Sequence, residues 1–487
     1  MSNMSEKNEY DAELALSPSI RKEETGATQP IQEDAVFGDI TEKGPNYRNV
    51  RIVCVCCDCL LTIAQVGWLG TVALMMKTQV GLGVLSIPSV FDTLGLVPGV
   101  ICLIAIATIT SWSGYMVGIF KLRHGSVYSI DDVGQLLFGR IGREIFAIAF
   151  ALYWICCAGS GMLSISIGLN ALSTHGACTA VFVAVGAIIG WACGSIQTLG
   201  RITWLAWVGL AGIITSILAL TIAVGVQDRP DAAPQEGHWQ SDYKIVGDPT
   251  FAEAAAALAS LVFAYAGTPA FFSIASEMRD PRHYTRSLII CQSCVTVIYV
   301  AIGIVVYYYC GSYVASPALG SAGVVMKKVC YGLALPGLIV TTTLMTHYPA
   351  KYAFVRILRG SRHLSSNSMV HWVTWLGCTG AIALIAYIIA SAVPVFYGLV
   401  ALVGALLGTM MSIQPMGCMW LYDNWSAGKV AKSPRWIAMV CWCVFVIAAG
   451  TFLMIAGTYG AIMGIMADYK AQGGSAAWSC ADNSNST

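Results

Sequence analysis

Thr78-Gln79-Val80-Gly81-Leu82-Gly83-Val84-Leu85-Ser86-Ile87-Pro88 interrupts an apolar segment that is otherwise long enough to cross a membrane. A second interruption, Phe263-Ala264-Tyr265-Ala266-Gly267-Thr268-Pro269-Ala270-Phe271-Phe272-Ser273, lies in another apolar segment five helices further along the chain. Backbone N–H and C=O groups inside a bilayer must be paired, so a broken helix is tolerated only where the freed groups face protein, water or a ligand. Two such breaks favour an internally repeated transporter with a central binding site.

The composition supports a membrane protein. The 487 residues are 56% hydrophobic and 11% charged, with a mean hydropathy of +0.68, whereas soluble domains carry about 25% charged residues. A net charge of +1 gives no reason to expect nucleic acid as a partner. The 18 cysteines are scattered through apolar segments and do not resemble a secreted disulfide framework. Cys178 and Cys310 fall at outer ends of spans and could pair, but the sequence gives no distance between them.

The sequence predicts an all-α architecture of eleven membrane spans between two polar tails. Residues 1–66 are expected to form a disordered cytoplasmic tail and residues 467–487 an extracellular one. The first repeat would cover residues 67–225 and the second 252–421, followed by a last span at 435–466. The predicted spans are 67–94 (broken), 97–120, 144–171, 176–195, 202–225, 252–276 (broken), 287–311, 326–348, 370–391, 394–421 and 435–466.

Cationic residues orient these spans. With the N-terminus in the cytoplasm, the tail and the inner loops carry 21 Lys and Arg, whereas the outer loops and C-terminus carry three. Cytoplasmic loops are enriched in Lys and Arg, so this asymmetry favours the cytoplasmic N-terminus. Eleven spans then place the C-terminus outside.

Residues 51–65, Arg-Ile-Val-Cys-Val-Cys-Cys-Asp-Cys-Leu-Leu-Thr-Ile-Ala-Gln, fit none of these elements. A zinc site is disfavoured because structural zinc sites use two separated ligand pairs. An extra span is disfavoured because the segment is short, contains Asp58 and would reverse the orientation. The interpretation we favour is the translation of a short retained intron, which sequencing of the transcript can test.

Several motifs resemble fungal members of the amino acid/auxin permease family. They are the 44–50 stretch Gly-Pro-Asn-Tyr-Arg-Asn-Val, the 67–71 stretch Gly-Trp-Leu-Gly-Thr and the 77–88 stretch that contains the first break. The resemblance covers roughly residues 35–470. It implies an amino acid transporter of five-plus-five inverted repeats, with broken helices in spans 1 and 6 and an eleventh helix outside the repeat. In that family the Asn-Val and Gly-Trp-Leu-Gly pieces run together, which supports the interpretation of 51–65 as an insertion.

The breaks can bind both charges of an amino acid without a charged side chain. A half-helix N-terminus offers N–H groups to the carboxylate, and a half-helix C-terminus offers carbonyls to the ammonium. Close packing of small residues is the alternative explanation of the glycines. No buried carboxylate is evident for a cationic side chain, because Asp92, Glu253 and Glu277 lie near span ends. The predicted substrate is therefore a neutral amino acid, aliphatic or aromatic. The predicted binding residues are Gln79, Gly81, Leu82, Gly83, Val84, Tyr265, Gly267, Thr268 and Phe271. Phe272 also flanks the second break, and Trp112 and Tyr153 are weaker candidates.

Lys77 is the most unusual side chain, roughly 15 Å into the first span at 1.5 Å per residue. Intramembrane lysines are rare and are treated as functional by default, although a lysine can also extend its amine to the headgroups. We predict that Lys77 approaches the span-8 hydroxyls and helps to couple uptake to protons, in preference to sodium; these hydroxyls belong to Thr341, Thr342 and Thr343.

The sequence therefore predicts a secondary transporter that imports neutral amino acids, with no cofactor and no enzymatic activity. No GxxxxGK[ST] motif for a nucleotide occurs. The expected location is the plasma membrane, with the vacuolar membrane as the alternative. A vacuolar exporter of the same fold and an amino acid sensor with little transport remain open. A seven-helix receptor is disfavoured by the eleven spans, and a membrane enzyme by the lack of a catalytic cluster. Asp131, Asp132, Arg140 and Arg143 are expected in a solvated inner loop or a cytoplasmic gate.

Overall fold

The computed structural model describes residues 51–52, 61–62, 66–197, 199–364, 366–393, 396–430, 432–471, 478 and 480–484. All of them belong to one compact unit, Ala35–Thr487, and the other unit, Met1–Asp34, lies outside the described residues. Most of the predicted cytoplasmic tail is therefore not described. Within the described part, ten helices are long and apolar enough to cross a membrane, and Thr179–Gly194 is a shorter apolar helix.

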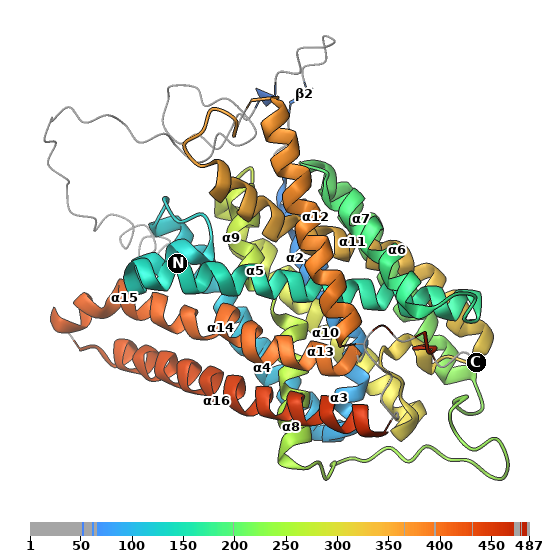
Figure 1. Ribbon diagram of the computed structural model, residues 1–487. Coiled ribbons are helices and arrows are strands. Elements are labelled where there is room, and N and C mark those ends of the chain that lie inside the picture. Colours follow the sequence, from blue (N-terminus) through green and yellow to red (C-terminus); the bar gives the residue numbers. More distant parts are fainter. Residues whose placement is uncertain are drawn as a thin grey trace, which may run out of the picture. The chain divides into compact units, whose positions relative to one another are not determined.

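These eleven segments confirm the predicted all-helical membrane fold (Figure 1). Both predicted breaks are present, in the first and the sixth segment. The elements are α2 (Trp68–Gln79), η2 (Gly83–Ser86), α3 (Ile87–Leu94), α4 (Leu96–Arg123), α5 (Ile130–Ser173), α6 (Thr179–Gly194), α7 (Leu199–Val226), α8 (Phe251–Tyr265), α9 (Thr268–Ser276), η3 (Pro281–His283), α10 (Tyr284–Cys310), η4 (Gly311–Tyr313), η5 (Ala318–Ser321), α11 (Val324–Leu358), α12 (Met369–Ala392), α13 (Phe396–Val403), η6 (Gly404–Gly408), α14 (Thr409–Ser412), α15 (Gln414–Val430) and α16 (Pro434–Ala471).

Two helices are much longer than hydropathy predicts. Helix α5 begins at Ile130 instead of 144, because a capping box formed by Ser129 and Asp132 starts a polar first segment. Gly139, with φ of 71°, then bends the chain into the apolar part. Helix α11 continues to Leu358, ten residues beyond the predicted end. Hydropathy detects only the part of a helix that needs lipid, so both polar extensions were missed.

Local chemistry explains the two breaks. Helix α2 ends at Gln79, and Val80 has a non-helical ψ of 86°. Helix α8 ends at Tyr265, and Ala266 has a ψ of 40°. After each break the chain resumes as an α-helix with a proline in its first turn, Pro88 in α3 and Pro269 in α9. Proline is tolerated there because the first N–H groups of a helix have no intrahelical partner.

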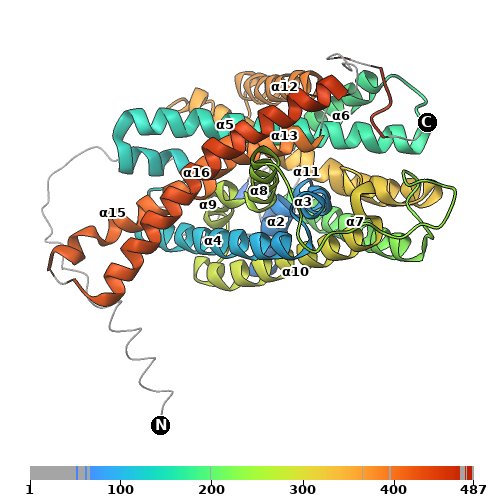
Figure 2. The same ribbon diagram turned by 90° about the horizontal axis from the view of Figure 1, so that it is seen from below.

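The broken helices lie in the middle of the helix bundle. Figure 2 shows α2, α3, α8 and α9 between α5 and α12 on one side and α4 and α10 on the other. Helix α10 runs in the same direction as α2. Near the start of both helices, Ser287 donates to the carbonyl of Trp68. Further along α10, Tyr299 donates to the carbonyl of Gln79 at the end of α2. Helix α11 packs between α5 and α7, and α16 packs along α8.

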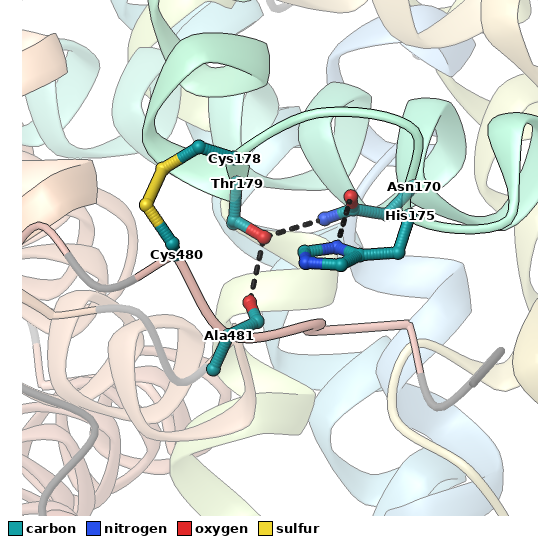
Figure 3. Close-up of a disulfide and its surroundings, with 6 residues drawn as sticks. All are labelled: Asn170, His175, Cys178, Thr179, Cys480 and Ala481. Carbon is teal, nitrogen blue, oxygen red and sulfur yellow. Dashed lines mark hydrogen bonds between the residues drawn. A yellow bond between two sulfur atoms is a disulfide. The ribbon is translucent and has the colours of Figure 1, made fainter.

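A disulfide marks one end of the bundle, which we call the disulfide end. Cys178, just before α6, is bonded to Cys480, which follows α16 in the chain (Figure 3). Beside it, Thr179 donates to the carbonyl of Ala481. Cys178 therefore does not pair with Cys310, a pairing that the sequence had left open. Cys310 is a free, buried thiol at the end of α10, because the docked C-terminal segment brings Cys480 to Cys178 instead.

The loop before α8 is also fixed at the disulfide end. The carboxylate of Asp242 accepts from the backbone N–H of Ser312 at 2.8 Å and from its hydroxyl at 2.6 Å. Partial burial opposes ionisation, but the hydrogen bonds from Ser312 and the nearby Lys244 outweigh it and lower the pKa of Asp242. This loop is therefore held by a charged acceptor.

Two short strands are described within the unexplained segment 51–65. Strand β1 (Arg51–Ile52) pairs antiparallel with β2 (Leu61–Thr62). The cysteines at 54, 56, 57 and 59 lie outside the described residues, so the interpretation of this segment as a retained intron stays a prediction.

Candidate functional site

The two breaks lie against each other. A Cβ atom added to Gly83 would lie 2.5 Å from the Cα of Ala264, at the end of α8. One added to Gly267 would collide with the hydroxyl of Thr78 and lie 3.1 Å from Cγ of Gln79. Ordinary contacts between carbon atoms are about 3.5–4.0 Å. The glycines therefore let the two unwound segments touch, and these segments form the candidate site.

Tyrosine hydroxyls contact the carbonyls that the breaks release. The hydroxyl of Tyr299, on α10, lies 2.9 Å from the carbonyl oxygens of both Gln79 and Ala264. Tyr153, on α5, donates to the carbonyl of Ala266. Tyr153 was only a weak candidate by sequence, and Tyr299 was missed. Nothing in the local sequence distinguishes Tyr299 from the other tyrosines of its helix.

Several buried polar groups around the breaks have no partner within the described part of the chain. Both the oxygen and the nitrogen of the Gln79 amide are unpaired, although its side chain is only 2% exposed. The hydroxyl of Thr268, at the start of α9, is also unpaired. A buried polar group without a partner costs about 1–3 kcal/mol. Such groups are candidate contacts for water or a ligand. The same holds nearby for Trp154 Nε1, Tyr348 Oη and Ser412 Oγ.

An aromatic path connects the second break with α11. The ring of Tyr153 lies 5.0 Å from that of Trp154, measured between centroids. The ring of Trp154 in turn lies 4.9 Å from that of Tyr348. These side chains extend the candidate site away from the disulfide end, and sequence reasoning did not identify Trp154 or Tyr348.

The predicted binding residues are all buried, but they do not all face the junction between the breaks. Leu82, Gly83 and Val84 lie at the start of η2, where the first N–H groups have no intrahelical partner. Tyr265 packs edge-on against Tyr299, with centroids 5.1 Å apart, and its hydroxyl donates to Thr296. The ring of Phe271 contacts α4, 3.5 Å from a Cβ position on Gly114. Phe271 is therefore placed as a packing residue between α9 and α4.

Lys77 is fully buried beside the first break. Its amine donates to the carbonyl of Val80 at 3.3 Å. Its Cε lies 3.1 Å from a Cβ position on Gly209 of α7, where Val340 of α11 also makes contact. No carboxylate among the described residues lies within ion-pair distance of it. Lys77 thus occupies the junction of α2, α7 and α11.

The three threonines of α11 point in different directions, because successive residues are rotated by about 100° around a helix. Thr341 faces the first break, with Oγ1 2.7 Å from a Cβ position on Gly81. Thr342 instead faces Gly161 of α5 and Gly190 of α6. Thr343 donates to the carbonyl four residues before it. Of the three, the structure brings only Thr341 to the break.

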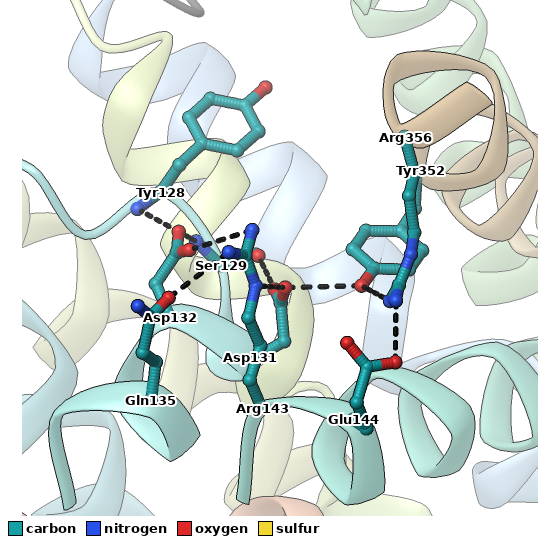
Figure 4. A network of polar contacts seen from close by, with 9 residues as sticks. All are labelled: Tyr128, Ser129, Asp131, Asp132, Gln135, Arg143, Glu144, Tyr352 and Arg356. Carbon is teal, nitrogen blue, oxygen red and sulfur yellow. Dashed lines mark hydrogen bonds and ion pairs between the residues drawn. The ribbon is translucent and has the colours of Figure 1, made fainter. Parts of the chain in front are cut away.

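A network of charges joins the helices at the end opposite the disulfide, which we call the basic end. Lys351 of α11 pairs with Glu277, at the end of α9, at 2.9 Å. Around the start of α5, Arg143 contacts Asp131 and Asp132, and Asp131 also accepts from Tyr352 (Figure 4). Asp131, Asp132 and Arg143 therefore do not lie in a solvated loop, because they belong to α5 and Asp131 is only 2% exposed, and their role as a gate stays a prediction. Figure 4 also shows the pair formed by Arg356 and Glu144.

Comparison with known proteins agrees with this geometry. Residues 64–463 match the family described as transmembrane amino acid transporter protein. A "Transmembrane transporter" of Gibberella moniliformis is 32% identical, covering 93% of this chain and 94% of its own length. The "N amino acid transport system protein" of Neurospora crassa is 31% identical, covering 86% of this chain and 88% of its own length.

The fold is also found among solved structures. A Na⁺-coupled sialic acid symporter is similar with a TM-score of 0.51 at 13% identity, covering 81% of this chain and 89% of that one. At this identity the likeness concerns the fold alone. The match over residues 64–463 shows that this chain belongs to the family of transmembrane amino acid transporters and is an integral multi-pass membrane protein.

Proposed function

We propose that this protein imports neutral amino acids by alternating access and that uptake is coupled to protons. The observation that carries the proposal is the buried junction of the two breaks. It combines helix ends with the unpaired amide of Gln79 and the unpaired hydroxyl of Thr268. The substrate's carboxylate would lie at the N–H groups of Leu82 to Val84, and its ammonium at the carbonyls that end α2 and α8.

The substrate's side chain is not cationic, because among the described residues the junction offers no carboxylate to pair with it. The carboxylate of Glu277 is paired with Lys351 at the basic end. Glu253 belongs to the capping box that starts α8. An ion without a partner is costly to bury, so lysine and arginine would be poor substrates.

Lys77 supports the proton coupling. Its amine reaches a carbonyl within the first break and has no ion-pair partner among the described residues. Losing and regaining a proton there would change the charge at the junction of α2, α7 and α11. We expect Lys77→Met to transport with a weaker dependence on external pH, with Lys328→Met, at the disulfide end, as the control. Unchanged uptake and unchanged pH dependence in Lys77→Met would eliminate this role.

Two observations support an orientation with the basic end in the cytoplasm. Lys and Arg are concentrated in the loops of that end. The disulfide lies at the opposite end, and disulfides form in oxidising compartments. The plasma membrane is the location consistent with import.

The test is uptake of radiolabelled amino acids by permease-deficient cells that express the protein. A panel of neutral, acidic and basic amino acids would be measured with and without a proton uncoupler. Accumulation of neutral amino acids that the uncoupler abolishes is the expected result. Absence of uptake by protein that reaches the plasma membrane would refute the proposal.

A further inference from the structure

Tyr299 connects the two breaks through a single atom. Its hydroxyl oxygen lies 2.9 Å from the last carbonyl of α2, at Gln79, and 2.9 Å from the carbonyl of Ala264 near the end of α8. The side chain is fully buried, and its ring packs against Tyr265. We propose that Tyr299 is a positioning residue that sets the separation of these two carbonyls for the substrate's ammonium group, an inference that rests on the proposed function.

The geometry limits how far apart the two carbonyl oxygens can be. Because each lies 2.9 Å from the same hydroxyl oxygen, their separation cannot exceed twice that distance. An ammonium group that donates to two oxygens also needs each of them about 2.7–2.9 Å from its nitrogen. The hydroxyl therefore holds the carbonyls within the span that one ammonium can bridge.

Both carbonyls keep capacity for the ammonium. A carbonyl oxygen has two lone pairs, and a tyrosine hydroxyl supplies only one proton. Ala264 and Gln79 therefore share one proton from Tyr299. Gln79 also accepts from the backbone N–H of Gly81 at 2.9 Å, so Ala264 has the greater free capacity.

The position of Tyr299 makes it suitable for this role. It belongs to α10, which is continuous from Tyr284 to Cys310, whereas α2 and α8 both end at the breaks. Because α10 is continuous, the hydroxyl of Tyr299 holds the ends of α2 and α8 in a fixed position relative to each other. Among the described residues, the hydroxyl of Tyr153 bonds to a carbonyl of the second break, that of Ala266, and to none of the first, so it cannot set the separation of α2 from α8.

The experiment compares Tyr299→Phe with Tyr307→Phe, which makes the same chemical change on the same helix. The hydroxyl of Tyr307 accepts from Lys244 at the disulfide end, away from the breaks. Uptake kinetics would be measured for a preferred neutral amino acid and for its N,N-dimethyl derivative, whose single N–H can donate to only one of the two carbonyls. Protein at the cell surface would be quantified for each variant.

We expect Tyr299→Phe to raise KM for the free amino acid about 10-fold. Without the hydroxyl the two carbonyls can separate, and the substrate's ammonium then loses one of its two charge-assisted hydrogen bonds. The KM of the N,N-dimethyl derivative should change less, because it cannot bridge both carbonyls in either protein, so the preference for the free amine should fall. Tyr307→Phe should keep both values. A fall in Vmax alone, equal for both substrates, would reduce Tyr299 to a structural role and overturn the inference. If the unmodified protein takes up neither substrate, the proposed function itself fails.

Discussion

The contact between the breaks is tested most directly by Gly83→Ala. The added methyl carbon would lie 2.5 Å from the Cα and 2.8 Å from the Cβ of Ala264. Normal carbon contacts are about 3.5–4.0 Å, so the two unwound segments must separate by about 1 Å. Because one of the colliding atoms is backbone, a change of rotamer cannot relieve the overlap. Overpacking of this kind costs about 1–3 kcal/mol.

A shift of 1 Å between groups that bind one ligand can cost about 100-fold in rate, so we expect Vmax/KM for neutral amino acids to fall about 10- to 100-fold. The matched control is Gly464→Ala on α16, where no atom lies within 4 Å of the new methyl group. Uptake would be divided by surface abundance, and thermal stability would be measured in detergent. The reasoning is refuted if Gly83→Ala, present at normal abundance, shows the KM and Vmax of the unmodified protein.

Other predictions concern contacts at the two ends of the bundle. Charge reversal by Glu277→Lys should abolish uptake, and adding Lys351→Glu should restore part of it; a double variant as inactive as the single one would show that the ion pair is not what matters. Cys480→Ser should lower the thermal midpoint, since removing a native disulfide costs about 2–5 kcal/mol, whereas Cys294→Ser, at an exposed free thiol, should not; equal midpoints would contradict this. Because the pKa of Asp242 is lowered from 3.8, its stabilising charge is present above that value and lost only below it. The difference in thermal midpoint between the unmodified protein and Asp242→Asn should therefore be constant from pH 7 to 5, and a difference that shrinks across this range would refute it.

The spans and the breaks were predictable because hydrophobic length and the Gly and Pro residues act locally. Thr78 to Pro88 contains the two glycines and the proline that end one helix and begin the next. The start of α5 was not predictable from hydropathy, because Ser129 caps a polar segment that does not need lipid. The family and amino acid transport were correctly predicted, whereas uptake by alternating access, the preferred amino acids and the coupling ion remain proposals.

The side-chain contacts of the site depended on helix rotation, which the sequence does not give. Helix α10 contains Tyr299, which reaches the breaks, and Tyr308, which is 46% exposed on its outer surface. Thr341 and Thr342 are adjacent in sequence but contact different helices. Cys178 pairs with Cys480 because the C-terminal segment docks beside α6, and no feature of the sequence near Cys178 predicts that docking.

The disulfide has a consequence for how the protein is made. Cys178 and Cys480 are separated by 302 positions, so the disulfide cannot form until all the later spans have been synthesised. A chain shortened after Ala471 would lack Cys480, so the covalent bond between the start of α6 and the C-terminal segment could not form.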